Sequence, residues 1–370
     1  MSKVLALIDL YSQLNLGLLS ENRTQASITF LGRYAFVDIA LSNLTNSNID
    51  KVGLLIKSNA NSIYKHIGNT NTYLANPRTG SINLLINEKG LTNPLYNTDF
   101  VNLKENNFIL YDEAEYVILT NAMYFMKLNY KAVVDEHIKS GKEVTMVYKK
   151  VESGEGFENA EKVVVDRLGN LQKLYYDKSE DASSIYLDTM IINKGLLLSL
   201  LNDESLGDAA TFRDVEKLLL KRLTNGIHMY EFKGFVRLFD SLEKYYKYSM
   251  EILNNEELFS EFFDDEEWKF STTSHNSSPV IYGPKAKVQN SILANGSKIY
   301  GTVRNSILAR DVIVEEGAEV EDSIIFTHCY IKKGTHVKGV IADKRVQFVH
   351  KLNVEGEEDK PLYIPRGAKI

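Results

Sequence analysis

Four aspartates are the residues of this sequence whose chemistry is most easily stated. Asp9, Asp99, Asp188 and Asp240 could stand near the ends of strands, where their carboxylate oxygens would suit a hard divalent cation such as Mg²⁺. Such a site could support a transfer reaction in which a metal neutralises developing charge. Most aspartates, however, lie on the surface or cap a helix, and that simpler interpretation applies to each of the four.

Arginines, histidines and a cysteine offer further chemistry. Arg23 and Arg33 could bind a phosphorylated effector, because guanidinium groups pair well with phosphate. His328 and His336 could act as general bases, although exposed structural histidines are the simpler interpretation. Cys329 is the single cysteine, which excludes a disulfide within the chain and a cysteine-based zinc site.

The elements that would position these side chains alternate between strands and helices over residues 1–240. Continuous apolar runs at 4–8, 51–56, 116–119 and 143–148 indicate buried parallel strands. Segments 37–44 and 129–138 carry apolar residues at helical spacing, and Gly141 follows the second segment. This alternation predicts an α/β fold with an open sheet.

A repeated pattern begins after Pro279. The sequence Val288-Gln-Asn-Ser-Ile-Leu293 recurs at 303–308 and 320–325, with a weaker copy at 337–342. Successive copies are offset by 15, 17 and 17 residues, which is typical of a hexapeptide β-helix with stacked coils. A small β-sandwich is the alternative.

A helical pattern at 240–258, an acidic stretch at 261–267 and a polar linker at 271–278 lie between these two regions. We therefore predict three parts. They are an α/β domain over 1–240, a helical connector and linker over 241–278, and a β-helix domain over 279–370.

Composition limits the function. The chain has 370 residues, of which 44% are apolar and 25% charged, so we expect a globular protein. Its 43 basic and 49 acidic residues give a net charge of −6, which argues against nucleic-acid binding. The first apolar stretch is interrupted by Asp9, does not resemble a signal peptide and is too short to span a membrane. We expect a cytoplasmic protein with no membrane or nucleic-acid partner.

A family resemblance lies in Phe30-Leu-Gly-Arg-Tyr-Ala-Phe-Val-Asp-Ile-Ala-Leu-Ser-Asn-Leu-Thr-Asn-Ser-Asn-Ile49. This segment resembles the signature F-G-G-K-Y-R-I-I-D-x-x-L-S-N-x-x-N-S-G-I of bacterial glucose-1-phosphate adenylyltransferases. Shorter similarities follow at 52–55, 164–171 and 230–235. The resemblance implies a nucleotidyltransferase (Rossmann-like) mixed-sheet domain followed by a left-handed parallel β-helix. It also implies a role in glycogen biosynthesis, where the family makes ADP-glucose and pyrophosphate from ATP and glucose 1-phosphate with Mg²⁺.

The groups with which that family binds the nucleotide are replaced at the aligned positions. Bulky side chains stand in the glycine-rich triphosphate loop, where they block close approach of the backbone to phosphate. An arginine of the loop, the phosphate-binding lysine and the base-reading glutamine are lost as well. The replacing residues are Leu10, Tyr11, Gln13, Asn15, Gln25 and Lys57.

The metal-binding carboxylates of the family are replaced too. The catalytic aspartate falls on Ala122, or on Asn121 if the gap is placed differently. The second aspartate falls on Leu238, two residues before Asp240. None of the aligned residues can serve as an anionic ligand for a hard cation.

The sugar and effector positions also depart from the family pattern. The glutamate and lysine that hold the sugar phosphate fall on Tyr176 and Asp177, with Lys178 next in sequence. An arginine of the effector region falls on Ala35, which leaves only the two arginines named above as effector ligands.

This set of losses, on a preserved signature, resembles the GlgD-type non-catalytic subunit of the family. The resemblance implies a hetero-oligomer, a tetramer, with a catalytic adenylyltransferase subunit that holds Mg²⁺, while this chain binds no metal or cofactor. Without its partner the chain could form homo-oligomers. Two alternatives stay open: a diverged but active nucleotidyltransferase that uses the four aspartates, and a hexapeptide acyltransferase that uses His328 or His336.

Overall fold

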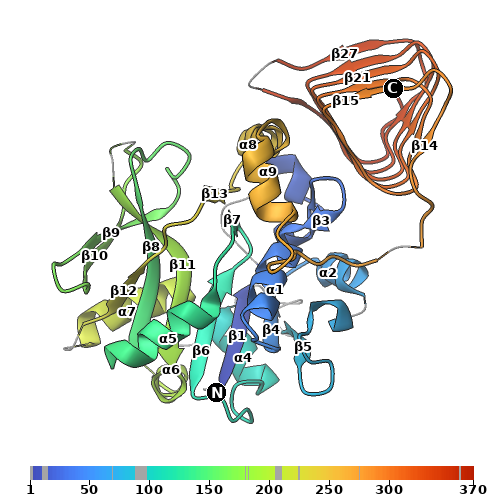
Figure 1. The fold of residues 1–370 in the computed structure, drawn as a ribbon. Helices are drawn as coiled ribbons and strands as arrows, with labels where there is room; N and C mark the ends of the chain where they lie inside the picture. The colour runs from blue at the N-terminus through green and yellow to red at the C-terminus, as the bar shows by residue number, and fades with distance from the viewer. Residues whose placement is uncertain are drawn as a thin grey trace. The chain divides into compact units, whose positions relative to one another are not determined.

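The computed structural model describes residues 3–10, 16–68, 70–87, 98–179, 181, 183–204, 211–223, 226–274, 276–357 and 360–370. The chain forms two compact units (Figure 1). Unit 1 comprises 1–14, 23–26 and 37–238, and unit 2 comprises 15–22, 27–36 and 239–370. No helix in the described part of the chain is long and apolar enough to cross a lipid bilayer.

Unit 1 is built on a nine-stranded sheet in the order β10-β9-β11-β6-β1-β4-β5, with β8 paired to β11 and β12. Strands β6, β1, β4 and β5 run parallel, whereas β11 is antiparallel to β6, β8 and β9. The sheet is therefore mixed, as the resemblance implied. Its strands are β1 (Val4–Asp9), β4 (Lys51–Ile56), β5 (Ser81–Ile86), β6 (Tyr116–Asn121), β8 (Val144–Val151), β9 (Glu161–Val165), β10 (Leu171–Tyr176), β11 (Ser183–Asn193) and β12 (His228–Glu231).

The apolar runs at 4–8, 51–56 and 116–119 form the predicted parallel strands β1, β4 and β6. The run at 143–148 is a buried strand, β8, but the predicted orientation is wrong for one of its neighbours. β8 pairs antiparallel with β11 and parallel only with β12. The error has a physical reason: an apolar run reports burial of both faces of a strand and not the direction of its neighbours.

Helices of unit 1 flank this sheet. The predicted helices at 37–44 and 129–138 are present as α1 and α5. The Asn129 side chain accepts a hydrogen bond from the Ala132 N–H at 3.2 Å, and Gly141 ends α5 with φ 64°. The helices are α1 (Phe36–Asn46), α2 (Ala60–Ile67), α4 (Asp99–Asn106), α5 (Tyr130–Ser140), α6 (Lys194–Leu201) and α7 (Phe212–Arg222), and a small separate sheet pairs β7 (Tyr124–Met126) with β13 (Val236–Leu238).

Unit 2 contains three five-stranded parallel sheets, which are the three sides of a β-helix. Figure 1 shows β15, β21 and β27 of one side stacked above one another. Parallel sheets exclude the β-sandwich alternative, whose strands would pair antiparallel. The sides are β14 (Ile281–Tyr282), β17 (Lys298–Ile299), β20 (Ile313–Val314), β23 (Tyr330–Ile331) and β26 (Gln347–Phe348); β15 (Lys287–Gln289), β18 (Thr302–Arg304), β21 (Glu319–Glu321), β24 (His336–Lys338) and β27 (Asn353–Glu355); and β16 (Ile292–Leu293), β19 (Ile307–Leu308), β22 (Ile324–Ile325), β25 (Val340–Ala342) and β28 (Leu362–Ile364).

The predicted repeats are in register from coil to coil. Val288, Val303, Val320 and Val337 are direct neighbours on one side of the β-helix. The residue two places after each valine turns the corner with positive φ: 43°, 44° and 44° at Asn290, Asn305 and Asp322, and 62° at Gly339. Asn, Asp and Gly are the residues that adopt this conformation most readily, which explains why the weaker copy has glycine there.

The repeated serine joins successive coils. Ser306 Oγ accepts a hydrogen bond from the Ser323 N–H at 3.1 Å, and Ser323 Oγ accepts one from the Val340 N–H at 3.2 Å. Ser291 Oγ accepts from the Ser306 N–H at 3.2 Å in the same way. Each hydroxyl thus accepts a hydrogen bond from a backbone amide of the next coil.

We expect Ser323→Ala to destabilise unit 2 by about 1–3 kcal/mol, because it leaves the buried Val340 amide without its acceptor. Ser291→Ala is the matched control, because Ser291 makes the same kind of bond in the more exposed first coil. Urea unfolding followed by circular dichroism would measure both. Equal losses in the two variants would contradict the role given to burial.

One corner of the β-helix is shorter than the corners stacked on it. Residues 300–301 join β17 to β18, whereas 315–318 and 332–335 join the equivalent strands of the next coils. This two-residue difference accounts for the offset of 15 rather than 17 between the first two repeats. A Cβ at Gly301 would lie 2.3 Å from the Ala318 carbonyl oxygen and 2.5 Å from that of Glu315, so the short corner requires glycine.

Two helices of unit 2 replace the single helix expected over 240–258. α8 (Leu242–Asn254) ends before Asn255, and α9 (Glu256–Phe263) begins after it. The Asn255 side chain accepts a hydrogen bond from the Leu258 N–H at 2.9 Å and so starts a new helix. The apolar spacing continues through Asn255, which is why the sequence pattern did not reveal the break. β2 (Thr29–Phe30) and β3 (Tyr34–Ala35) form a short antiparallel pair in the same unit.

Candidate functional site

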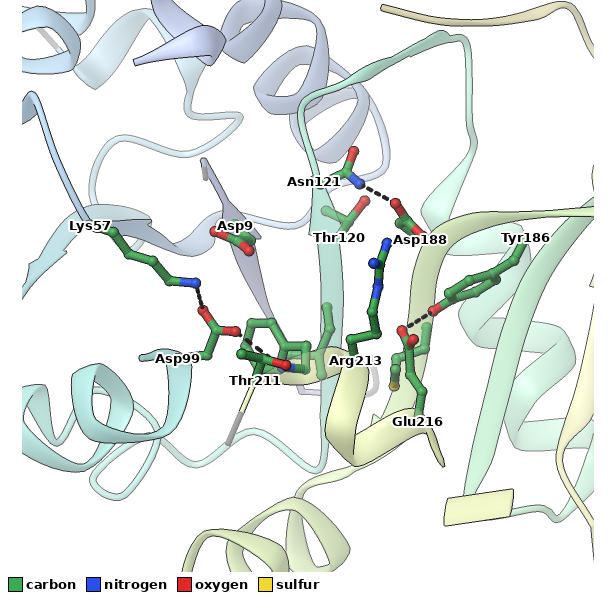
Figure 2. A pocket seen from close by; sticks show the side chains of 13 residues that line it. Asp9, Lys57, Asp99, Thr120, Asn121, Tyr186, Asp188, Thr211, Arg213 and Glu216 are labelled. Atoms are coloured by element: carbon green, nitrogen blue, oxygen red, sulfur yellow. Dashed lines mark hydrogen bonds and ion pairs between the residues drawn. The ribbon is translucent and has the colours of Figure 1, made fainter. Parts of the chain in front are cut away.

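A cavity of about 260 Å³ lies in unit 1 at the carboxyl ends of the parallel strands β1 and β6 (Figure 2). Ligands of open α/β sheets bind outside this edge, so the cavity is the first candidate for a functional site. Its lining is Asp9, Lys57, Asp99, Leu119, Thr120, Asn121, Tyr186, Asp188, Met190, Thr211, Phe212, Arg213 and Glu216.

The neighbouring strands β1 and β6 bring Asp9 and Asn121 together. Asp9 is the last residue of β1, Asn121 is the last residue of β6, and the two are direct partners in the parallel register. Lys57 follows the end of β4, the next strand of the sheet. Parallel pairing of apolar strands thus delivers a carboxylate, an amide and an ammonium group to one edge.

Lys57 and Asp99 form a buried ion pair. Lys57 Nζ lies 2.6 Å from Asp99 Oδ1, and the two side chains are only 7% and 3% exposed. Asp99 Oδ2 also accepts a hydrogen bond from the Phe212 N–H at 3.0 Å, at the start of α7. The pair therefore joins β4, α4 and α7 along one wall of the cavity.

Asp188 enters the cavity from an irregular point of β11. The register with β8 shifts between Tyr186 and Met190, and Asp188 has φ 43°. Its Oδ2 accepts a hydrogen bond from Asn121 Nδ2 at 3.0 Å. Burial, followed by the charge of Glu161, raises the pKa of Asp188 to about 7, although the Asn121 hydrogen bond acts in the opposite direction.

A second carboxyl stands beside it on α7. Glu216 Oε1 accepts a hydrogen bond from the Tyr186 hydroxyl at 2.9 Å. Burial, together with Asp188 and Glu161, raises the pKa of Glu216 well above its ordinary value. Arg213 Nε lies 3.8 Å from Glu161 Oε1, and in Figure 2 the Arg213 side chain extends toward Asp188. The cavity wall is therefore rich in carboxyl groups, and each of its two cations already faces one.

The start of α7 explains how the sequence places Arg213 and Glu216. Thr211 caps the helix in a reciprocal arrangement with Asp214, with the Thr211 N–H donating to Asp214 Oδ2 at 3.0 Å. The pattern Thr-x-x-Asp, visible at 211–214, is the signal in the sequence for the start of this helix. Nothing in the sequence pattern marks Tyr186 or Glu216 as site residues.

Comparisons with known proteins match both regions of the chain. The family model for nucleotidyl transferases matches residues 16–161, and the model for the GlmU-like C-terminal hexapeptide matches residues 280–363. The glucose-1-phosphate adenylyltransferase of Desulfitobacterium hafniense strain Y51 is 28% identical over 385 aligned residues, which cover 96% of this chain and 93% of the relative. This chain is thus similar to the glucose-1-phosphate adenylyltransferases over nearly its whole length.

Other adenylyltransferases are similar over most of the chain. That of Acetivibrio thermocellus is 27% identical and covers 90% of this chain and 78% of the relative. That of Bacillus anthracis is 26% identical and covers 88% and 87%. These matches agree with the resemblance to the adenylyltransferase family and with a hexapeptide β-helix of the left-handed type after the nucleotidyltransferase domain.

The positions aligned with the metal-binding aspartates of the adenylyltransferases hold apolar side chains. Ala122 and Leu238 are 3% and 1% exposed. Leu238 pairs with Tyr124 across β13 and β7, so the two positions lie near each other in unit 1. The alternative position, Asn121, donates to Asp188 and accepts a hydrogen bond from the Met123 N–H at 2.9 Å.

Of the four aspartates singled out in the sequence, Asp9, Asp99 and Asp188 line the same cavity. Asp240 belongs to unit 2. There it lies 2.9 Å from Lys244 Nζ, one turn along the start of α8. Asp240 is therefore part of a buried i, i+4 ion pair and does not belong to the cavity of unit 1.

The positions aligned with the sugar-phosphate ligands are outside the lining of the cavity. Tyr176 is 50% exposed at the end of β10, and its hydroxyl donates to Asn159 Oδ1 at 3.0 Å. Asp177 accepts a hydrogen bond from the Ser179 N–H at 3.0 Å, and the bonds to Ser179 lower the pKa of Asp177. Lys178 follows them and is exposed.

The aligned triphosphate loop is described only in part. Leu10 is buried, and its N–H donates to the Leu55 carbonyl oxygen at 3.2 Å. Tyr11, Gln13 and Asn15 lie outside the described residues. Gln25 is buried in a single turn of 3₁₀ helix, Gln25–Ser27.

The two arginines predicted to bind an effector differ in their surroundings. Arg23 is buried in unit 1. Arg33 is exposed in unit 2, where it donates to the Tyr34 hydroxyl at 2.7 Å and stacks 4.9 Å from the centre of the same ring. The aligned position Ala35 is fully buried.

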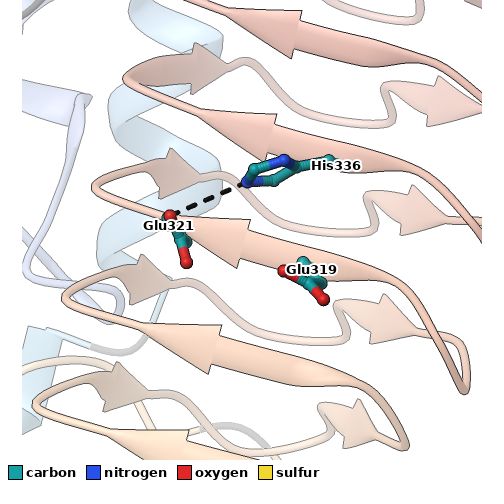
Figure 3. Close-up of side chains that lie close together, drawn as sticks. All are labelled: Glu319, Glu321 and His336. Atoms are coloured by element: carbon teal, nitrogen blue, oxygen red, sulfur yellow. Dashed lines mark ion pairs between the residues drawn. The ribbon is translucent and has the colours of Figure 1, made fainter.

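The two histidines lie on the β-helix. His328 is exposed and is 3.7 Å from Asp311. His336 lies close to Glu319 and Glu321 (Figure 3), and within the described residues this trio is close enough to share a metal ion. Arg304 Nη1, however, lies 2.9 Å from Glu321 and already compensates its charge. The trio is better described as a network of ion pairs on the outer face of the β-helix.

Proposed function

We propose that this chain is a non-catalytic, regulatory subunit of a glucose-1-phosphate adenylyltransferase. It assembles with a catalytic subunit into a hetero-oligomer, a tetramer by the family resemblance, and raises that partner's synthesis of ADP-glucose from ATP and glucose 1-phosphate. The catalytic partner holds Mg²⁺ in this proposal, and this chain supplies no metal ligand to the reaction. Without the partner, the chain forms homo-oligomers.

The observation that carries the proposal is the pair of buried apolar residues, Ala122 and Leu238, at the positions aligned with the metal-binding aspartates. The reaction of the family needs Mg²⁺ to neutralise charge on the transferred phosphorus, and neither side chain has an oxygen with which to bind it. Lys57 supports the same conclusion, because it stands at the position of the base-reading glutamine and is paired with Asp99.

A subunit without chemistry can raise its partner's rate only by binding the active conformation of that partner more tightly than the inactive one. ADP-glucose formation by three samples tests this: the chain alone, the catalytic subunit of the same organism alone, and the mixture. We expect no product from the chain alone and a higher rate or substrate affinity in the mixture. Activity of the chain alone, or a failure of the two chains to associate in sedimentation, would overturn the proposal.

A diverged but active nucleotidyltransferase is the second candidate, because Asp9, Asp99 and Asp188 line one cavity. It requires that at least Asp9 and Asp188 bind Mg²⁺ together with ATP. Calorimetric titration of ATP into the chain, with and without Mg²⁺, tests it. Binding that depends on Mg²⁺ and is lost in Asp9→Asn would favour this candidate over the regulatory subunit.

A further inference from the structure

The first coil of the β-helix is an open end of the stack. Strands β14, β15 and β16 each stand last in their sheet, and within the described residues no strand pairs with their outer edge. Figure 1 shows β15 at one end of its side and β27 at the other. The end of such a stack needs a cover, because a coil without a neighbour leaves part of its apolar core in contact with water.

The core positions of the first coil are less buried than those of the later coils. Val288 is 37% exposed, whereas its neighbours in register, Val303 and Val320, are fully buried. Tyr282 of β14 is 57% exposed, and it pairs with Ile299, which is fully buried. The apolar core of the β-helix is therefore partly open to solvent at this end.

The backbone of the first coil also presents groups for pairing. In β15, the Lys287 N–H donates to the next coil at 3.1 Å, and the Gln289 carbonyl oxygen accepts from that coil at 3.1 Å. Successive residues of a strand direct these groups to opposite sides, so the N–H and C=O of Val288 face the open end. Tyr282 and Leu293 hold the equivalent positions in β14 and β16. The open end thus offers one strand edge on each side of the β-helix, and such edges readily pair with further strands.

The other end of the stack is partly covered by the chain itself. The N–H groups of Gln347 and Val349 donate to the carbonyl oxygens of Ala368 and Ile370, at 2.8 Å and 2.7 Å. The C-terminal residues therefore pair with β26, the last strand of its sheet. The first coil is thus the end at which a second chain can add strands.

Charge distinguishes between the partners that could cover the open end. Residues 279–296 contain two lysines, Lys285 and Lys287, and no carboxylate. Lys285 pairs with Glu316 at 2.7 Å, whereas Lys287 has no ion-pair partner among the described residues. A second copy would bring a rim of the same charge, and like charges that face each other oppose association. A partner with carboxylates beside its own strand edges would be attracted instead.

We infer that the open end of the β-helix docks onto the end coil of a second β-helix, in a different polypeptide whose end coil carries carboxylates. Such a coil can pair with all three strand edges at once, whereas a single extended segment can pair with only one of them. This docking mode rests on the proposed function, because it takes the catalytic subunit as the second polypeptide. It adds the surface by which the chain recognises that subunit and the reason why it prefers that subunit to its own copy.

Two variants of the full chain, mixed with the catalytic subunit of the same organism, test this surface. Val288→Pro removes the outward N–H of β15 without breaking a bond to the second coil, and Lys287→Glu reverses the charge of the rim. We expect each to weaken the association about tenfold or more in sedimentation velocity. Asn353→Pro is the matched control and should leave the affinity unchanged. The Asn353 N–H also faces away from the stack, but in β27, the last strand of the same side.

Unchanged affinity in Val288→Pro or in Lys287→Glu would overturn this docking mode and leave the partnership intact. Failure of the wild-type chains to associate would overturn both. Loss of a homo-oligomer of this chain in Val288→Pro would show that the open end binds a second copy, which contradicts the proposal. Circular dichroism establishes that each variant is folded. If Val288→Pro does not fold, Lys287→Glu decides alone, because it changes an exposed side chain.

Discussion

Lys57→Met is expected to lower the stability of unit 1 by about 3–5 kcal/mol, because it leaves the Asp99 carboxylate buried without its ion partner. A charge that is buried without a partner costs far more stability than a well-formed buried ion pair contributes. Removing one partner is therefore more destabilising than replacing both. In a unit of this size the melting temperature should fall by roughly 10 °C. Thermal unfolding followed by circular dichroism would measure it.

Two variants control this experiment. Lys51→Met removes the ion pair at the start of β4, in which Lys51 Nζ lies 2.6 Å from Asp112 Oδ2. Lys51 is 44% exposed, so the loss of stability should be at most about 1 kcal/mol. Adding Asp99→Asn to Lys57→Met should restore much of the stability, since the amide oxygen can still accept the Phe212 N–H. A double variant no more stable than Lys57→Met would argue that the methionine, rather than the orphaned charge, causes the loss.

Asp188→Asn is expected to remove a pH dependence of stability. The ordinary pKa of this carboxyl is 3.8 and its pKa in the folded protein is about 7, so between these values the folded state binds the additional proton. The contribution of Asp188 to stability is therefore complete below pH 3.8 and is lost as the pH rises toward 7, at up to about 1.4 kcal/mol per pH unit.

Urea unfolding of the wild type and of Asp188→Asn across this pH range would measure the difference. The variant should gain stability relative to the wild type as the pH rises, and the difference should level off above pH 8 or so. Asp177→Asn is a control of opposite sign, because the pKa of Asp177 is lowered by its bonds to Ser179 and its contribution is lost as the pH falls. A flat difference between the wild type and Asp188→Asn would show that Asp188 titrates near its ordinary pKa.

The repeats of unit 2 were the most predictable part of the fold. The register of Val288, Val303 and Val320 follows directly from the spacing, because stacked coils bring equivalent residues together. Apolar runs predicted the positions of β1, β4, β6 and β8 equally well. They did not predict that β8 pairs antiparallel with β11, which depends on the path of the chain between strands and not on the strand itself.

The candidate site was predictable only as separate residues. Asp9 could be placed at a strand end, but its proximity to Asp188 depends on the antiparallel pairing of β11 with β6 and on the irregular backbone near Asp188. Asp240, which the sequence offers equally, is paired with Lys244 in the other unit. Local sequence patterns report burial and periodicity, and they do not specify which distant carboxylates meet.

The short corner at Gly301 shows how the number of residues in one coil of the β-helix can change without loss of its core. Two residues fewer in one coil leave the valines, the turning Asn or Asp residues and the serine hydroxyls of the neighbouring coils aligned, because the difference is confined to residues 300–301. Insertions and deletions can therefore be accepted at this corner during evolution, provided that a shortened corner carries glycine. The same corner is a rational place at which to graft a loop into the protein.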